Sequence, residues 1–420
     1  MLPLELIRKD PDRIRRAAAL KGEPAPIDEI LELDRDWRTH QNAAETIKAE
    51  QNRLSREFAK SRDETLKDSL RDMAERAKAE LAEAERIKAT LDDLLLRVPN
   101  VFDVSVPVGE TEADNVIERE WGSKVDLGFP ARTHYDLGEA LGIMDFERAA
   151  RVSGSRFAFL VGEGAHLERA LVQFMLDVHT REHGYTEVHP PVLVNSASMT
   201  GTANLPKFAA DAFKIEGQDL WLIPTSEVPL TNLHREEILD GERLPLRYVA
   251  YSPCFRSEAG SAGQDTRGYI RLHQFSKVEL VKVTTAETSM DEFEKLVADA
   301  EDVLRRLGLH FQVMAMCTGD MGFAQFKKYD LNAWSPGLDR YLEVSSCSVF
   351  NEFQATRANI RYRPARGAPP RFAHTINGSG LALPRTIDAI IETYQQSNGT
   401  INVPEVLRPY MGGLEVIGAR

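Results

Sequence analysis

Two long helices are predicted in the first hundred residues. Within residues 30–58, nine positions follow one another at alternating spacings of three and four residues. All nine are apolar except His40 and Gln51. Residues 66–98 repeat the pattern. Such spacing puts the apolar side chains on one helical face and is typical of a coiled-coil seam.

The polar stretch between the two runs, residues 60–64, predicts a turn, and residues 28–98 contain neither Gly nor Pro. Two helices joined in this way pack antiparallel, and each would be about 50 Å long. The result is an arm too thin to enclose a pocket. Taken alone, it could be a solvated spacer or an oligomerisation device.

The tip of this arm is locally basic. Residues 47–62 hold five basic side chains against two acidic ones. A phosphate contact far from the body of a protein requires such a cluster. The basic residues are Lys48, Arg53, Arg56, Lys60 and Arg62.

The rest of the chain has shorter patterns. Residues 98–130 are rich in Gly and Pro and lack periodicity, which indicates a linker. Because the strand-like runs that follow do not alternate regularly with helices, they predict an antiparallel α+β body. Helical patterns occupy 167–178, 290–307 and 385–396, and strand-like runs occupy 185–188, 220–224, 246–258, 269–283 and 341–348.

Composition is that of a globular protein: of 420 residues, 42% are hydrophobic and 28% charged. The net charge of −13 means that a polyanionic partner needs a local basic surface. The first residues do not resemble a secretion signal, and no apolar run approaches the roughly 20 residues of a membrane span, so we expect a cytoplasmic protein without a membrane partner. Three separated cysteines without a CxxC pair predict neither disulfides nor a structural zinc site.

Other patterns bear on function by elimination. His179, Glu182 and His183 spell the HxxEH pattern of some zinc peptidases. They fall in the last turn of a predicted helix, where the helix dipole favours histidine, so we expect a structural role. Neither a GxGxxG fingerprint nor a GxxxxGK[ST] phosphate loop occurs, and the two commonest nucleotide-binding folds therefore lack support.

Residues 251–283 predict a long hairpin with polar side chains on one sheet surface. Charges that pair across strands could make this a solvated face, but a phenylalanine among them favours a binding surface. The residues expected to share faces are Cys254, Arg256 and Glu258 on the outgoing strand and Phe275, Lys277, Glu279 and Val281 on the return strand.

Two shorter clusters have a similar character. IPTSEVPLTN, residues 223–232, would place Thr225 and Glu227 on one strand face just before a helix. HTINGSGLALPR, residues 374–385, offers small hydroxyl and amide groups followed by Arg385. Taken alone, an ordinary polar turn explains either cluster.

Together these segments resemble seryl-tRNA synthetases, a family of class II aminoacyl-tRNA synthetases. The coiled coil fits as well, so the resemblance spans nearly the whole chain. The segments are, in order, LERALVQFMLDVHTREHGYTEVHPP, PTSEVPLTN, FRSEAGSAGQDTRGYIRLHQFSKVE, EVSSCSVFNEFQATRANIRYR, NGSGLALPRT and VPEVLRPYMGG.

The resemblance implies an α+β fold, in which an antiparallel-sheet class II catalytic domain follows an N-terminal antiparallel coiled-coil arm. The implied domains are a helical domain at 1–100 with its tRNA-binding arm at about 28–98, a linker and entry to the body at 101–130, and the catalytic domain at 131–420. The segment around Pro190 and Pro191 looks like motif 1, which builds the dimer interface in this family.

The resemblance places ATP on the hairpin and on the strand at 341–348. Arg256 and Arg385 look like the catalytic arginines of motifs 2 and 3, which hold the α-phosphate from opposite sides. Glu258 would accept from the adenine amino group, and Phe275 would stack on the ring. The other ATP-binding positions are the backbone near Leu272 and residues Glu343, Val344, Ser345 and Ser346.

Glu343 and Ser346 also resemble the family's Mg²⁺ ligands, which are hard oxygen donors. Strand alternation would pair Glu343 with Ser345 instead, so this assignment requires a β-bulge or a strand end. Motif 3 of the class usually has an acidic residue in a glycine-rich run before its arginine, whereas this chain has Leu383 and Pro384. A proline there is compatible with the start of a helix.

The serine pocket follows from the same resemblance. Carboxylates are the expected partners of an α-ammonium group and a substrate hydroxyl. A site that hydrogen-bonds a hydroxyl can reject alanine by about 10⁴ to 10⁵. The matching residues are Thr225, Glu227, Arg256, Glu279, Asn377 and Ser379.

The expected reaction joins L-serine to the 3′ end of tRNA(Ser), and of tRNA(Sec) as is usual in the family, through seryl-adenylate made from ATP with Mg²⁺. A homodimer is expected. One alternative is an amino acid:carrier-protein ligase, a relative that lacks the arm. The other is a catalytically inactive RNA-binding homologue, for which Arg256, Glu258, Glu343 and Arg385 would not all be required.

Overall fold

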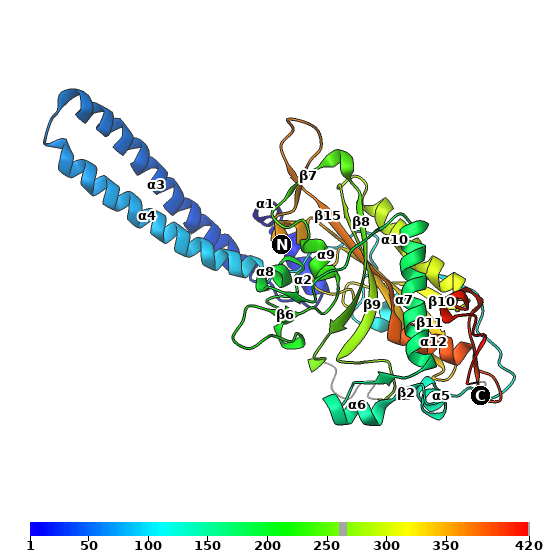
Figure 1. The fold of residues 1–420 in the computed structure, drawn as a ribbon. Coiled ribbons are helices and arrows are strands. Elements are labelled where there is room, and N and C mark those ends of the chain that lie inside the picture. Colours follow the sequence, from blue (N-terminus) through cyan, green and yellow to red (C-terminus); the bar gives the residue numbers. More distant parts are fainter. Residues whose placement is uncertain (260–266, 419–420) are drawn as a thin grey trace. The chain divides into compact units, whose positions relative to one another are not determined.

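The computed structural model describes residues 1–259 and 267–418, and the chain divides into two compact units, Met1–Pro99 and Asn100–Arg420. In the first unit, two short helices, α1 (Leu4–Lys9) and α2 (Pro11–Leu20), precede the long helices α3 (Ile27–Ser61) and α4 (Leu66–Leu95) (Figure 1). The long helices run antiparallel, as the two apolar repeats predict. The second ends at Leu95, three residues before the end of its repeat.

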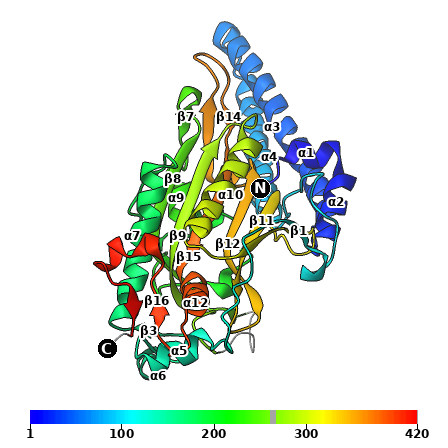
Figure 2. The same ribbon diagram turned by 90° about the vertical axis from the view of Figure 1, so that its right-hand side faces the viewer.

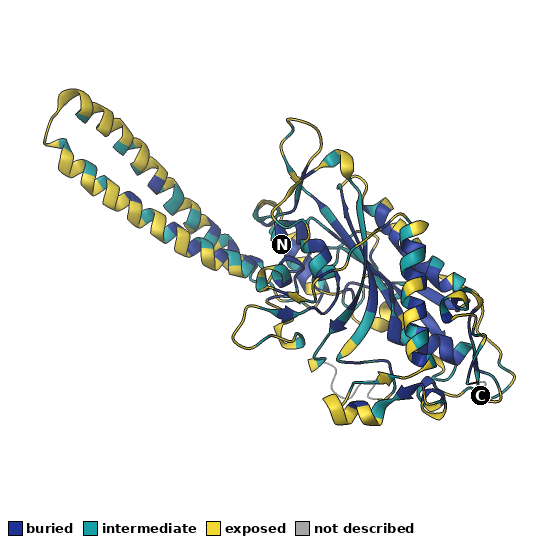
Figure 3. Cartoon of the chain, viewed as in Figure 1, coloured by how far each residue is buried: buried dark blue, intermediate teal, exposed yellow. Residues whose placement is uncertain are grey.

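The two polar positions of the seam bridge α3 and α4. His40 Nδ1 lies 2.6 Å from Glu80 Oε2, and Gln51 Nε2 donates to the backbone oxygen of Leu70 at 3.2 Å. The five basic residues of the predicted tip are all exposed (Figure 3). One of them, Arg53, forms an ion pair in which its Nη2 lies 2.6 Å from Glu50 Oε1.

The second unit is built on an eight-stranded sheet (Figure 2). All neighbouring strands pair antiparallel except the last two, which are parallel, and the predicted α+β class is therefore confirmed. In spatial order the strands are β1 (Val116–Trp121), β10 (Phe311–Ala315), β11 (Lys327–Ser335), β12 (Arg340–Asn351), β15 (His374–Ala382), β9 (Gln274–Thr284), β8 (Leu246–Phe255) and β4 (Thr186–Glu187).

Three amphipathic helices bury one face of this sheet: α7 (Glu163–Arg181), α10 (Ser289–Arg306) and α12 (Leu383–Thr393). Their apolar stripes and the alternate residues of the strands form the main core, in which Val278 and Leu280 of β9 are fully buried. Because side chains alternate along a strand, Glu279, which lies between these two residues, points to the opposite face. That face carries the candidate site.

The other elements are short, and several of them form small sheets beside the main one. The helices are α5 (His134–Ala140), α6 (Phe146–Ser153), α8 (Ser196–Gly201), α9 (Glu227–Asn232) and α11 (Phe353–Ala358), with 3₁₀ turns η1 (Glu112–Asp114), η2 (Ala209–Asp211), η3 (Gly241–Arg243), η5 (Glu405–Leu407) and η6 (Pro409–Met411). The strands are β2 (Met144–Asp145), β3 (Phe159–Leu160), β5 (Leu193–Val194), β6 (Trp221–Leu222), β7 (Ile238–Asp240), β13 (Arg361–Arg363), β14 (Arg371–Phe372), β16 (Ile401–Asn402) and β17 (Val416–Ile417).

The structure corrects several predicted boundaries. Residues 116–121, expected in a linker, form the edge strand β1. The hairpin strands β8 and β9 pair in the predicted way, but β8 ends at Phe255 and β9 begins only at Gln274, so Arg256 and Glu258 follow the strand instead of sharing its face. Part of the loop between them, residues 260–266, lies outside the described residues. Residues 374–382 form strand β15 rather than a polar turn.

The segment 223–232 also differs from its prediction. Strand β6 ends at Leu222, and Glu227 is the first residue of helix α9, so Thr225 and Glu227 do not lie on one strand face. The reason is local: Pro224 and Pro229 cannot donate to a strand ladder, but a proline is tolerated in the first turn of a helix, where N–H groups have no intrahelical partner.

The HxxEH side chains lie at the end of α7, as expected. His179 is buried, and this burial lowers its pKa to about 3. Glu182 pairs with Arg306 at 2.6 Å, and His183 Nε2 lies 3.0 Å from Asp302 Oδ2. Glu182 and His183 thus make structural contacts with helix α10. Of the helices within the described residues, none has both the length and the apolar character that crossing a membrane requires.

Candidate active site

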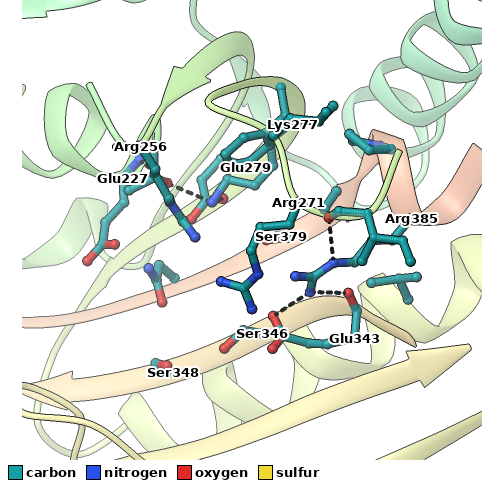
Figure 4. Close-up of a pocket in the computed structure, with 18 of the residues that line it drawn as sticks. Glu227, Arg256, Arg271, Lys277, Glu279, Glu343, Ser346, Ser348, Ser379 and Arg385 are labelled. Atoms are coloured by element: carbon teal, nitrogen blue, oxygen red, sulfur yellow. Dashed lines mark hydrogen bonds and ion pairs between the residues drawn. The ribbon is translucent and has the colours of Figure 1, made fainter. Parts of the chain in front are cut away.

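A cavity of about 370 Å³ lies on the face of the sheet opposite the core helices (Figure 4). Its walls come from β9, β12, β15, the start of α12 and the segments on either side of the hairpin loop. All but one of the site residues predicted in the body line it. These are Thr225, Glu227, Arg256, Glu258, Leu272, Phe275, Glu279, Glu343, Val344, Ser346, Asn377, Ser379 and Arg385.

Ser345 is the exception. Its side chain is buried beside the cavity, where its Oγ donates to the backbone oxygen of Ser379 at 2.6 Å. This residue therefore supports the wall and does not face the cavity.

A β-bulge explains how both Glu343 and Ser346 reach the cavity. Ser345 pairs with Leu331 on the neighbouring strand β11, whereas the next residue of β11, Asn332, already pairs with Glu343. One residue of β12, Val344, is thus extra, and the alternation of side chains shifts by one position. Of the two possibilities that the assignment of Glu343 and Ser346 left open, a β-bulge or a strand end, the structure has the bulge.

The two arginines enter the cavity from distant parts of the chain. Arg256 directly follows β8, where its Nε donates to the backbone oxygen of Pro224 at 3.3 Å and its guanidinium lies 5.2 Å from the centre of the Phe275 ring. Arg385 lies in the first turn of α12, where its Nη1 donates to the backbone oxygen of Glu343 at 2.8 Å. Both guanidinium groups point into the same space (Figure 4).

The first turn of α12 fixes the direction of Arg385. Strand β15 ends at Ala382 and the helix begins at the next residue, with Pro384 in its first turn as the sequence predicts. The preset backbone angle of proline suits this position, and its missing N–H is not needed there. The arginine is held further by its Nε, which donates to the backbone oxygen of Ile270 at 3.3 Å.

One end of the cavity holds two carboxylates with different partners. Glu279 is 1% exposed, and its carboxylate lies 2.6 Å from the ammonium of Lys277, which also donates to Thr225 Oγ1 at 2.7 Å. Glu227 instead accepts a hydrogen bond from the neutral amide of Gln354 at 2.6 Å. Burial, together with the charge of Glu279, raises the pKa of Glu227 to about 7.

Gln354 has a defined orientation behind Glu227. Its Oε1 accepts from the hydroxyl of Thr375 at 2.6 Å, so its amide nitrogen must face the carboxylate. The three side chains come from α11, β15 and α9. They form a chain of hydrogen bonds that fixes the position of Glu227.

At the other end, Glu258 is held by an arginine. Its carboxylate lies 2.6 Å from Arg271 Nη1, and its backbone has a φ of 52°, in the left-handed region that non-glycine residues rarely adopt. Such a conformation persists only where the surrounding contacts hold it. The residue is therefore placed by the fold and not by strand geometry.

Several lining residues were not predicted from the sequence as site residues: Arg271, Lys277, Gln325, Lys328 and Ser348. For Lys277 a signal existed, because it alternates with Phe275 and Glu279. Lys328 lies on β11, a strand that the apolar pattern did not predict. It faces the cavity only because β11 pairs with β12.

The charges along β11 and β12 influence one another. Lys328 Nζ lies 3.1 Å from Asp330 Oδ2, and burial raises the pKa of Asp330 to about 6 despite this ammonium. Partial desolvation disfavours the ionised form of Glu343 as well. The positive charges of Arg385 and Lys328 outweigh this effect and hold the pKa of Glu343 below its ordinary value. This wall of the cavity thus offers ionised carboxylate beside cations, which suits a ligand that carries both phosphate and metal.

Comparison with known proteins gives a consistent result. Residues 1–102 match the family model of the seryl-tRNA synthetase N-terminal domain, and residues 212–394 match that of the class II tRNA synthetase core domain (G, H, P, S and T). A serine–tRNA ligase from Pelotomaculum thermopropionicum is 51% identical over 424 aligned residues, with 100% of each chain covered.

Two solved structures are similar over nearly their whole length. The seryl-tRNA synthetase from Pyrococcus horikoshii, complexed with ATP, is 40% identical with a TM-score of 0.93, and 99% of each chain is covered. The cytoplasmic serine–tRNA ligase from Naegleria fowleri, in complex with AMP, is 32% identical with a TM-score of 0.89 and covers 99% of this chain and 98% of its own.

Proposed function

The chain belongs to the seryl-tRNA synthetase family and is an ATP-dependent ligase, and we propose that its cavity joins L-serine to tRNA in two steps. In the first, a carboxylate oxygen of serine bonds to the α-phosphorus of ATP and the bond from that phosphorus to pyrophosphate breaks. In the second, a ribose hydroxyl oxygen at the 3′ end of tRNA bonds to the seryl carbonyl carbon, the bond from that carbon to AMP breaks, and the hydroxyl proton is released.

The observation that carries this proposal is the approach of Arg256 and Arg385 to one space from segments far apart in sequence. Negative charge builds around the α-phosphorus during adenylation, and guanidinium donors held in place before the reaction stabilise it. Each guanidinium is held by a backbone oxygen. The remaining contribution is the positioning of the two reactants, which requires no side chain to act as a base.

For serine, the partners of the two carboxylates suggest different roles. Glu279 is already paired with Lys277, whereas Glu227 accepts from a neutral amide, so the ionised form of Glu227 is available to another cation. We assign Glu227 to the serine ammonium and Glu279 to the serine hydroxyl. Thr225, Asn377 and Ser379 complete this end of the cavity.

For ATP, Phe275 offers a ring face to the adenine, and Glu258 offers an acceptor to its amino group, with the backbone near Leu272 and Val344 alongside. A Mg²⁺ ion fits beside them, because the bulge in β12 brings a carboxylate, Glu343, and a hydroxyl, Ser346, onto one wall. When bound, the ion would neutralise charge on the phosphates. These two side chains alone would not hold it, since Mg²⁺ in such sites also takes phosphate and water ligands.

The exposed basic tip of the arm supports a contact with tRNA phosphates. We propose tRNA(Ser) as the nucleic-acid substrate, with tRNA(Sec) as a second one, and a cytoplasmic homodimer that forms through the segment around Pro190 and Pro191. The alternatives are not favoured: a carrier-protein ligase would lack the arm, and an inactive homologue would not need four charged side chains in one cavity.

The test is serine-dependent exchange of pyrophosphate into ATP by the Arg256→Ala variant. We expect exchange to fall by at least about 10²-fold, as for loss of one oxyanion donor, with no change in the thermal unfolding midpoint. Arg151→Ala is the matched control, since Arg151 is exposed and lies outside the cavity. Wild-type-like exchange by Arg256→Ala would reject the role assigned to this arginine. Charging of total tRNA with each of the twenty amino acids tests the choice of serine.

A further inference from the structure

The return segment, residues 269–271, holds two groups of the candidate active site. The backbone oxygen of Ile270 accepts from Arg385 Nε at 3.3 Å, and Arg271 Nη1 lies 2.6 Å from the carboxylate of Glu258. In the proposed function, Arg385 and Glu258 both contact ATP. The position of the return segment therefore affects how well ATP is aligned.

The return segment belongs to no helix or strand, and it packs on a buried imidazole. This ring is that of His134, the first residue of α5, which is fully buried. The backbone N–H of Tyr269 donates to His134 Nε2 at 3.2 Å. Gly268, just before the segment, lies so close to the ring that a methyl group on its Cα would collide with Nε2. The imidazole thus limits where the return segment can lie.

The partners of the imidazole determine where its proton lies. Because the Tyr269 N–H points at Nε2, this nitrogen is the acceptor and the ring proton lies on Nδ1. Nδ1 lies 2.8 Å from Glu392 Oε1, to which it donates. Asp388 Oδ2 is 3.6 Å from Nε2, which is too long for a hydrogen bond. His134 therefore connects the return segment to Glu392.

Glu392 is a fixed partner for the imidazole. It is fully buried, and its carboxylate also accepts from the backbone N–H groups of His134 at 2.8 Å and Gly337 at 2.9 Å. The hydroxyl of Ser335 donates to it as well. A buried carboxylate with several donors has little freedom to move, so the connection through His134 has a defined length.

We propose that His134 is a positioning residue for the adenylation step. Glu392 lies on α12, and the first turn of the same helix carries Arg385. The connection through His134 and the hydrogen bond from Arg385 to Ile270 therefore join the same two parts of the chain, α12 and the return segment. By holding these parts together, His134 keeps Arg385 in place before ATP binds. The inference rests on the proposed function, which assigns the α-phosphate to Arg385.

Two substitutions separate the two contacts of His134. His134→Asn keeps an amide nitrogen near the place of Nδ1, where it can donate to Glu392, but offers no acceptor to the Tyr269 N–H. His134→Gln has an amide oxygen near the place of Nε2 and so keeps this acceptor. A purely structural role would affect only the stability of these variants, whereas a positioning role makes their ATP affinities differ.

The experiment measures ATP affinity by calorimetry on the full-length protein, together with the KM values for ATP and serine in pyrophosphate exchange. A buried donor left without its acceptor typically changes an equilibrium by about 10-fold. We expect His134→Asn to bind ATP about 10-fold more weakly, with a similar rise in the ATP KM and an unchanged serine KM. His134→Gln should bind ATP as the wild-type protein does.

Gly268→Ala tests the same contact with the imidazole intact. Its methyl group would meet Nε2, and the φ of 89° at this residue disfavours alanine, so the return segment must move. We expect weaker ATP binding and an unchanged serine KM here too. Wild-type ATP affinity in this variant would refute the inference even if His134→Asn did not fold.

The matched control is His310→Asn. His310 is 9% exposed, its Nδ1 lies 2.7 Å from the backbone oxygen of Trp121, and its Nε2 lies 2.8 Å from the Tyr341 hydroxyl. It does not line the candidate active site. Asparagine at this position should lower the thermal unfolding midpoint and leave ATP affinity unchanged.

The inference would be overturned by unchanged ATP affinity in His134→Asn, or by an equal loss in His134→Gln or in His310→Asn. A parallel rise in the serine KM of His134→Asn would also overturn it, because the whole site would then be disturbed. Absence of serine-dependent exchange in the wild-type protein would instead refute the proposed function, and the ATP affinities would still test the role of His134.

Discussion

The affinity for serine should depend on pH through Glu227. This carboxylate has a pKa of about 7, because burial and the charge of Glu279 both disfavour its ionised form. In the proposed complex only the ionised form attracts the serine ammonium. A carboxylate is ionised above its pKa and protonated below it. The attraction is therefore present above pH 7 and is lost as the pH falls below 7.

The size of the effect follows from the ionised fraction. With a pKa near 7, about nine-tenths of Glu227 is ionised at pH 8 and about one-tenth at pH 6. We therefore expect the KM for serine in pyrophosphate exchange to rise roughly 10-fold between pH 8 and pH 6, while the KM for ATP changes by less than about 2-fold.

Two variants sharpen this test. Glu227→Gln removes the titrating group, so its serine KM should be high and flat over the same range. Gln354→Leu removes the hydrogen bond that favours the ionised form, so the pKa of Glu227 should rise and the inflection should move to higher pH. A wild-type serine KM that is flat from pH 6 to 8, or the same inflection in Glu227→Gln, would refute the reasoning.

Three further predictions concern other parts of the molecule. Replacement of Lys48, Arg56 and Lys60 by alanine should leave pyrophosphate exchange unchanged but raise the KM for tRNA and flatten its dependence on salt, because phosphate contacts release counterions; an unchanged salt slope would argue against contact at the tip. Lys277→Met should raise the serine KM more than the ATP KM, because it leaves the buried Glu279 unpaired, and an equal rise in both would count against a role at the serine end. Phe293→Ala, which empties a fully buried site that stacks on the Tyr329 ring at 5.3 Å, should lower the free energy of unfolding in urea by about 3–5 kcal/mol, and a loss under 1 kcal/mol would mean that the core had closed around the gap.

The sequence was informative wherever a repeat or an alternation acts over several residues. The seam of α3 and α4 and the face of β9 that carries Phe275 and Glu279 follow directly from such periodicity. For Glu343 and Ser346, the family resemblance required either a β-bulge or a strand end, and the structure has the bulge.

What the sequence did not reveal depends on contacts between distant segments. The place of Lys328 depends on the pairing of β11 with β12, and that of Gln354 depends on the packing of α11 beside β15. Glu258 adopts a left-handed backbone that no propensity predicts for glutamate. The strand predicted through Thr225 was wrong. Pro224 and Pro229 cannot donate hydrogen bonds to a strand ladder but are compatible with the start of a helix, so the alternation of polar residues did not produce a strand here.

The cross-helix contacts of His40 and Gln51 give the arm a fixed length. A seam of apolar side chains alone would be almost as well packed after one helix slides past the other by seven residues. Such a slide would separate His40 from Glu80 and Gln51 from the Leu70 carbonyl, so each wrong register lacks two polar contacts that the correct one has. The two helices therefore favour a single register. The basic tip then stays a constant number of helical turns from the beginning of α3.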